Sequence, residues 1–246
     1  MTYDQVLRMH RVYLEYRKAG SERQLHVGVM MSCKTLRGLP SRFTKAFPLK
    51  GEIKSIFGRP LEGAYHCLHY ADYSDLTDFN DVVLALQFAG PYASAIQFDM
   101  PWPNLGIVAN PLAVHHYHIE VILQIGQMAL SLEGFDPNKV VRRLAEYQGH
   151  IDRVLLDQSM GKGEPMKADV LLPYLRAIRK AYPHLGLVVA GGLGPNSLDL
   201  VRPILDEFPD VSIDAQGKLR PSTNSLDPID WDMAGSYLAQ GLKLLS

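Results

Sequence analysis

Short apolar runs recur along the chain, and each is long enough to form a buried strand. Apolar runs of this kind are typical of strands that are covered on both faces, as in a parallel sheet. The sequence therefore predicts seven strands, at His26–Met31, Tyr65–Tyr70, Ala95–Met100, Glu120–Ile125, Arg153–Asp157, Leu187–Ala190 and Val211–Asp214.

Segments with helical spacing lie between and around these runs. Residues 3–18 form an amphipathic stripe that includes Val6, Met9 and Tyr13, and Gly20 ends it. The other predicted helices are Leu76–Phe88, Pro137–Tyr147, Ala168–Ala181, Asn196–Phe208 and Trp231–Leu245. The second half of the chain therefore alternates strand and helix, which implies a parallel sheet.

Repeats of about 30 residues over this length favour a closed (β/α)8 TIM-type barrel over an open doubly wound sheet. We expect residues 1–246 to form a single domain of this class, with the N-terminal helix as an addition. The eighth strand is the least defined element. Either it lies within Ser32–Glu62, where prolines and glycines interrupt the pattern, or the first part of the barrel is irregular or incomplete.

Composition narrows the function classes. Hydrophobic residues make up 47% of the chain and charged residues 21%, as in ordinary globular proteins. The net charge of -1 gives no basic excess for binding nucleic acid, so no nucleic-acid partner is expected. Charged residues interrupt the N-terminal helix, so neither a membrane partner nor a signal peptide is expected. Cys33 and Cys67 are too few for a disulfide scaffold, which favours a cytoplasmic location. Homo-oligomer formation stays open.

Glycine-rich loops follow the last two predicted strands. Val188–Ala190 continues into Gly191, Gly192 and Gly194 and then a helix start, and Gly217 follows the next strand. Glycines at such junctions let backbone N–H groups approach an anion, and in barrels the last two loops frequently hold a phosphate. The alternative is that these glycines serve only a tight turn. Agreement between two adjacent strand ends favours a phosphate site.

Four motifs together, over about residues 93–220, resemble phosphoribosylanthranilate isomerase. The motifs are Leu155-Leu156-Asp157, Gly161-Lys162-Gly163, Ala190-Gly191-Gly192-Leu193-Gly194-Pro195 and Asp214-Ala215-Gln216-Gly217. Ala95-Ile96-Gln97-Phe98 resembles an earlier strand of the family. The family is a phosphate-binding TIM barrel that converts an aminoaldose phosphate to an aminoketose without a cofactor, using a carboxylic acid and a thiolate.

The resemblance implies roles for particular residues. Asp157 matches the general acid, the backbone of Gly191, Gly192, Gly194 and Gly217 matches the phosphate site, and Gln97, Lys162 and Asp214 are expected on the substrate side. Two family features are missing, the Lys-x-Cys-Gly strand and the Ser-Pro-Arg segment. Cys33 lies just past the first predicted strand and is the candidate base in place of the family's cysteine, and Ser41-Arg42 lies in the region of the second feature.

Other side chains at strand ends extend this list. Asp157 and Asp99 each end an apolar run, where a partly buried carboxylate can exchange protons with a substrate, although each could instead cap a turn. His66 and His69 point to opposite faces of one strand, and hydrogen-bonded histidines explain His115, His116 and His118 better than a ligand role, so no metal is expected.

Three hypotheses about function follow. The first is a cofactor-independent isomerase of the aldose–ketose type, acting on a phosphorylated sugar or sugar conjugate with Asp157 as acid. The second is a non-catalytic barrel that binds a phosphorylated ligand, and an aldolase or epimerase on the same scaffold is a third. A base such as Cys33, His69 or Asp99 across the mouth from Asp157 would favour the enzyme.

Overall fold

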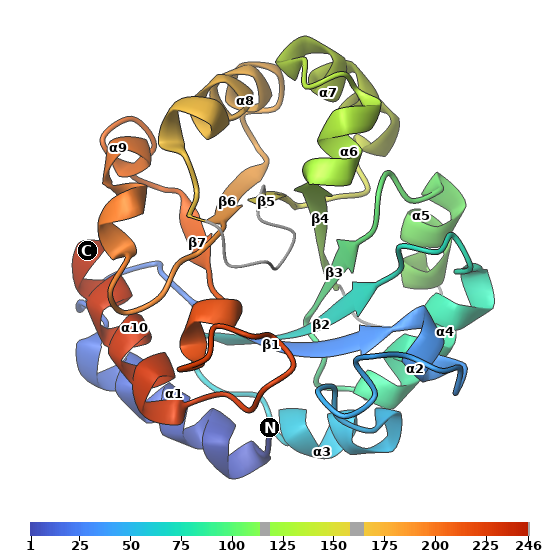
Figure 1. Cartoon of the computed structure of the whole chain (residues 1–246), viewed down its shortest axis with the longest axis vertical. Helices are drawn as coiled ribbons and strands as arrows, with labels where there is room; N and C mark the ends of the chain where they lie inside the picture. The colour runs from blue at the N-terminus through green and yellow to red at the C-terminus, as the bar shows by residue number, and fades with distance from the viewer. Residues whose placement is uncertain (114–118, 158–164, 246) are drawn as a thin grey trace.

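The computed structural model describes residues 1–113, 119–157 and 165–245. In this part of the chain the sheet contains seven parallel strands in the sequential order β1 to β7. Figure 1 shows that the sheet curls around a central space and that helices surround it. The strands are β1 (Leu25–Ser32), β2 (Ala64–Ala71), β3 (Ala95–Asp99), β4 (Glu120–Gly126), β5 (Arg153–Asp157), β6 (Gly186–Ala190) and β7 (Ser212–Asp214).

Helices cover the outer face of the curled sheet. They pack against the outward-facing strand residues in one large apolar cluster, while a second, smaller cluster lies between the inward-facing side chains of β2 to β6. The helices are α1 (Tyr3–Tyr16), α2 (Cys33–Leu36), α3 (Ile53–Phe57), α4 (Phe79–Ala89), α5 (Leu105–Ala113), α6 (Gln127–Leu132), α7 (Pro137–Leu144), α8 (Ala168–Ala181), α9 (Arg202–Leu205) and α10 (Trp231–Leu244), with 3-10 turns η1 (Lys50–Glu52), η2 (Ala145–Tyr147), η3 (Leu198–Val201) and η4 (Gly217–Leu219). None of the helices in the described ranges is long and apolar enough to cross a membrane.

All seven predicted strands are confirmed to within two residues, and the structure corrects two helices. The predicted helix Leu76–Phe88 begins instead at Phe79, because Asp78 caps it and the backbone N–H groups of Leu76 and Thr77 donate to Asp72. The predicted helix Asn196–Phe208 is divided into η3 and α9. Pro203 lacks the N–H that would continue the helical hydrogen bonds across this point.

The curled sheet does not close on itself. Residues 33–63 contain α2, η1 and α3 and no strand, so the prediction of an incomplete barrel is the correct alternative. β1 and β7 form the two edges of the sheet and do not pair with each other. At the N-terminal end of this opening, the Arg23 guanidinium donates to the backbone carbonyls of Asp210 and Val211 at 3.2 and 2.8 Å.

Helices α1 and α10 lie side by side outside this opening (Figure 1). Thr2 caps α1 together with Gln5, and Asp230 caps α10 by accepting from the backbone of Asp232 and Met233. An ion pair between Arg8 and Asp232 joins the two helices. The first and last helices of the chain therefore cover the place where a further strand would complete the barrel.

Candidate active site at the strand ends

A cavity of 810 Å³ lies at the carboxyl ends of the strands. Residues from the ends of β2, β3, β5, β6 and β7 line it, together with the loops that follow them. The carboxyl ends of parallel strands are where barrel enzymes carry their active sites, because all the strand-to-helix loops meet there. We refer to this space as the mouth cavity.

The last three strands bring the predicted acid and the predicted phosphate loops to the same level. In the parallel register Asp157 of β5 pairs with Ala190 of β6, and Ala190 pairs with Asp214 of β7. Asp157, Gly191 and Asp214 therefore stand at one end of the sheet, and all three line the mouth cavity. The predicted consecutive, parallel arrangement of these strands is confirmed.

A histidine from β2 lines the same cavity. His69 near the end of β2 has its Nε2 3.1 Å from Oδ2 of Asp99 at the end of β3, and each side chain is only 14% exposed. The Tyr73 hydroxyl donates to the other carboxylate oxygen of Asp99. Asp99 therefore orients the His69 ring, as a carboxylate commonly does for a general base.

The electrostatics of this cluster favour an exchangeable proton. Burial lowers the pKa of His69, but the hydrogen bond to Asp99 and the negative charges of Asp99, Asp214 and Asp157 outweigh burial and raise it above its ordinary value. Burial raises the pKa of Asp214, and Asp157 and Asp99 raise it further against the opposing effect of His69. The raised pKa values make His69 and Asp214 the two members of the cluster that are best suited to hold a proton.

The two glycine loops form one wall of the mouth cavity. Gly191 and Gly192 have φ values of 126° and 60°, which residues other than glycine rarely adopt. Both line the cavity together with Gly217. Gly194 lies at the contact between the loops, since an added Cβ would stand 2.6 Å from Cβ of Lys218 and 2.9 Å from its carbonyl oxygen. The loop after β6 therefore packs directly on the loop after β7, in the place predicted for a phosphate.

Cations also line the mouth cavity. Lys218 follows Gly217, Lys34 comes from α2, and Arg42 comes from the segment after α2. Arg42 lies over the Phe43 ring, 4.7 Å from its centroid, and Ser41 is a further lining residue. The cavity therefore combines cations and glycine backbone with the acid–base cluster, which suits an anionic ligand.

The remaining predicted residues lie elsewhere. Cys33 is fully buried in the outer core, where burial raises the pKa of its thiol, and it does not line the mouth cavity. Gln97 lies deeper in the barrel and donates to Oε1 of Gln124 at 2.6 Å. Lys162 and His115, His116 and His118 lie outside the described residues. Within the described ranges no cluster of three or more possible metal ligands occurs.

Sequence reasoning named His69 only as one of three candidate bases. The signal that would have favoured it is its position on the inward face of β2, two residues after Cys67, beside the strand that ends in Asp99. The contribution of Tyr73 depends on a loop conformation, and nothing in the sequence pattern indicates it.

The architecture is that of a TIM-type barrel, with seven parallel strands and the intervening helices in barrel order. Among solved structures, the fold is that of the phosphoribosylanthranilate isomerases. The enzyme from Thermus thermophilus aligns with a TM-score of 0.61 at 12% identity, over 99% of this chain and 96% of its own. The enzyme from Thermotoga maritima aligns with a TM-score of 0.57 at 15% identity, over 95% of this chain and 92% of its own.

A third isomerase structure contains the ligand reduced 1-(o-carboxyphenylamino)-1-deoxyribulose 5-phosphate. It aligns with a TM-score of 0.58 at 14% identity, over 95% of this chain and 91% of its own. No family model matches the sequence, and no curated protein matches it either. The resemblance predicted from the motifs is therefore confirmed for the fold, and it extends from residues 93–220 to nearly the whole chain.

Proposed function

We propose that this protein is a phosphate-binding barrel enzyme, an isomerase of the aldose–ketose type that acts on a phosphorylated sugar or sugar conjugate. One observation carries the proposal. The mouth cavity brings the glycine loops after β6 and β7 together with Asp157, His69, Asp99 and Asp214 in a single space. A phosphate at the loops would hold the sugar carbons beside groups that can give and take protons.

The proposed reaction needs one acid and one base. Asp157 donates a proton to the ring oxygen of the sugar, and the ring opens. His69, oriented by Asp99, removes the proton from the second carbon and leaves an enol. The protonated His69 then gives its proton to the first carbon, while the enol hydroxyl gives its proton to the Asp157 carboxylate and the second carbon becomes the ketone. Asp157 and His69 thus each end the cycle as they began it. The raised pKa of His69 strengthens it as a base.

The absence of Cys33 from the mouth cavity distinguishes this proposal from the chemistry that the resemblance implied. The family pairs its acid with a thiolate, whereas here the His69 imidazole lines the same cavity as Asp157. The likeness to an isomerase that binds a ribulose phosphate derivative supports the phosphate part of the proposal. The panel of phosphorylated substrates described next identifies the non-phosphate part.

The test is an Asp157→Asn variant studied with a panel of phosphorylated aldoses and aminoaldoses. We expect inorganic phosphate to bind the wild type and the variant within a few-fold of each other, because the glycine loops hold it. Turnover by the variant should fall by about 10²–10⁴-fold, which is the usual contribution of a positioned acid. His69→Gln should reduce turnover with the same unchanged phosphate affinity.

Two outcomes would contradict the proposal. Full activity of the Asp157→Asn variant would show that Asp157 is not the acid and only shapes the turn after β5. Binding of phosphorylated ligands to the wild type with no turnover of any member of the panel would instead favour a non-catalytic binding barrel. An unchanged melting temperature of each variant serves as the control for an intact fold.

A further inference from the structure

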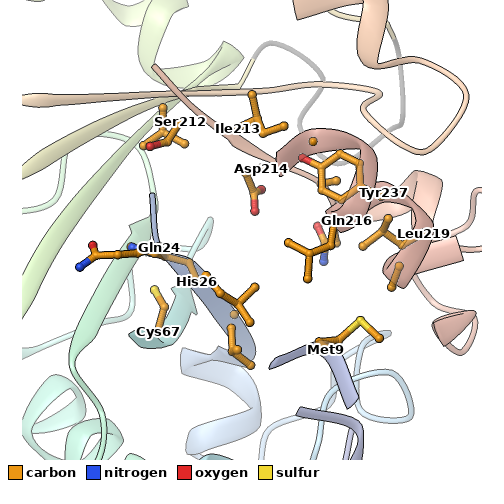
Figure 2. Close-up of a pocket in the computed structure, with 18 of the residues that line it drawn as sticks. Met9, Gln24, His26, Cys67, Ser212, Ile213, Asp214, Gln216, Leu219 and Tyr237 are labelled. Carbon is orange, nitrogen blue, oxygen red and sulfur yellow. The ribbon is translucent and has the colours of Figure 1, made fainter. Parts of the chain in front are cut away.

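A second and larger cavity lies inside the opening between β1 and β7. Its volume is 1170 Å³, and we call it the side chamber. Figure 2 shows Asp214 pointing into it, with His26 and Cys67 across from Asp214 and Tyr237 of α10 beside it. The side chamber occupies the place that a strand between β1 and β7 would fill.

The side chamber adjoins the acid–base cluster. Met30, His69, Asp214, Ala215 and Gln216 line both the side chamber and the mouth cavity. A single ligand can therefore contact the glycine loops at one end, pass His69 and Asp214, and extend between β1 and β7.

One wall of the side chamber is apolar. Helices α1 and α10 provide Met9, Ala234, Leu238 and Leu242. On the opposite wall Gly28 of β1 is exposed to the space, and an added Cβ would find no atom within 4 Å. Ligand sites are typically lined by apolar side chains with a few placed polar groups, and their volumes are about 300–1,000 Å³. The two cavities together exceed what a simple sugar phosphate fills.

The arginine side chains that line the side chamber are already engaged. Arg23 donates to backbone carbonyls, Arg153 pairs with Glu120, and Arg220 donates to the carbonyls of Gln216 and Asp227 at 2.5 and 2.6 Å. Burial lowers the pKa of His26 to about 4, so its ring is neutral near pH 7. A negatively charged group would gain little in this space, which favours an uncharged ligand group.

The Tyr237 side chain of α10 adds to the apolar lining. Its hydroxyl lies near the Asp214 carboxylate, is buried and makes no hydrogen bond. Because that oxygen has almost no accessible surface, a ligand in the side chamber contacts the ring of Tyr237 and not its hydroxyl.

We propose that the side chamber binds an uncharged, largely apolar arm of the ligand. The inference rests on the proposed function, since it places the phosphate of the same ligand at the loops after β6 and β7. It identifies the substrate class as a phosphate ester whose non-phosphate part is a neutral apolar arm.

The test measures binding of inorganic phosphate and of n-alkyl phosphates from methyl to hexyl by titration calorimetry. Once the chain reaches the side chamber, each further buried methylene should tighten binding by about fourfold. Gly28→Leu fills the side chamber and should abolish this gain while leaving the affinity for inorganic phosphate unchanged. Ser212→Leu fills it from β7 and replaces Gly28→Leu if that variant does not fold, and Gly28→Ala is the small control.

A second probe separates the side chamber from the phosphate site. 1-Hexanol, which has no phosphate, should bind the wild type in ligand-detected NMR and should not bind to Gly28→Leu. If hexanol binds in this way but inorganic phosphate does not bind, the proposed function is wrong, while the binding of an apolar group in the side chamber is supported. Equal affinities for methyl and hexyl phosphate, or a hexyl gain that persists in both filling variants, would overturn the inference.

Discussion

Replacing Gly194 by alanine tests whether contact between the loops after β6 and β7 shapes the proposed phosphate site. The added Cβ would stand 2.6 Å from Cβ of Lys218 and 2.9 Å from the Lys218 carbonyl oxygen. The carbonyl belongs to the backbone and cannot rotate away as the end of a side chain does. The two loops must therefore separate before the methyl group fits.

The cost follows from the size of this overlap. Forcing one methyl into a well-packed contact typically costs about 1–3 kcal/mol, and we expect the free energy of unfolding to fall by that amount. Separation of the loops also moves the backbone N–H groups of Gly192 and Gly217 apart. Losing one hydrogen bond to a charged phosphate, worth about 1.5 kcal/mol, would weaken phosphate binding by about tenfold.

Gly51→Ala provides the matched control. Gly51 has no positive φ, and an added Cβ there would meet no atom within 4 Å, so the free energy of unfolding should change by less than about 0.5 kcal/mol. Urea unfolding measures stability, and calorimetric titration with inorganic phosphate measures affinity. A Gly194→Ala protein as stable as Gly51→Ala, with unchanged phosphate affinity, would refute the proposed contact between the loops.

Three further predictions follow from the buried groups. Because the pKa of His69 is raised in the folded state, its protonated ring stabilises the fold fully below the unfolded pKa, and this stabilisation is lost as pH rises through the folded pKa. The difference in unfolding free energy between wild type and His69→Gln, measured by urea unfolding, should therefore shrink across that interval. A constant difference would contradict the prediction. Arg23→Ala should lower the free energy of unfolding by about 1–3 kcal/mol in the same assay, because it leaves carbonyls at the β1–β7 opening without their donor. An unchanged free energy would show that water replaces the guanidinium. Cys33 and Cys67 are buried, and burial raises the pKa of both thiols. Neither should therefore react with a thiol-specific disulfide reagent at pH 8 until urea unfolds the chain. Rapid reaction of the folded protein would argue against this packing.

The sequence determined the strands and the end of the barrel that carries the candidate site. Apolar runs such as Arg153–Asp157 match the strands almost residue for residue, because a strand buried on both faces needs an unbroken apolar stretch. The glycines after β6 and β7 and the carboxylates Asp157, Asp99 and Asp214 were also readable, since parallel strands bring their carboxyl ends to one side.

Only the tertiary structure decided which side chains meet across the barrel. Cys33 and His69 were both candidate bases by position, yet the short helix α2 turns Cys33 into the outer core while the strand period of two points His69 inward to Asp99. The opening between β1 and β7 was equally hidden. Whether two distant strands pair depends on closure of the whole sheet, and a local pattern of apolar residues contains no information about that long-range contact.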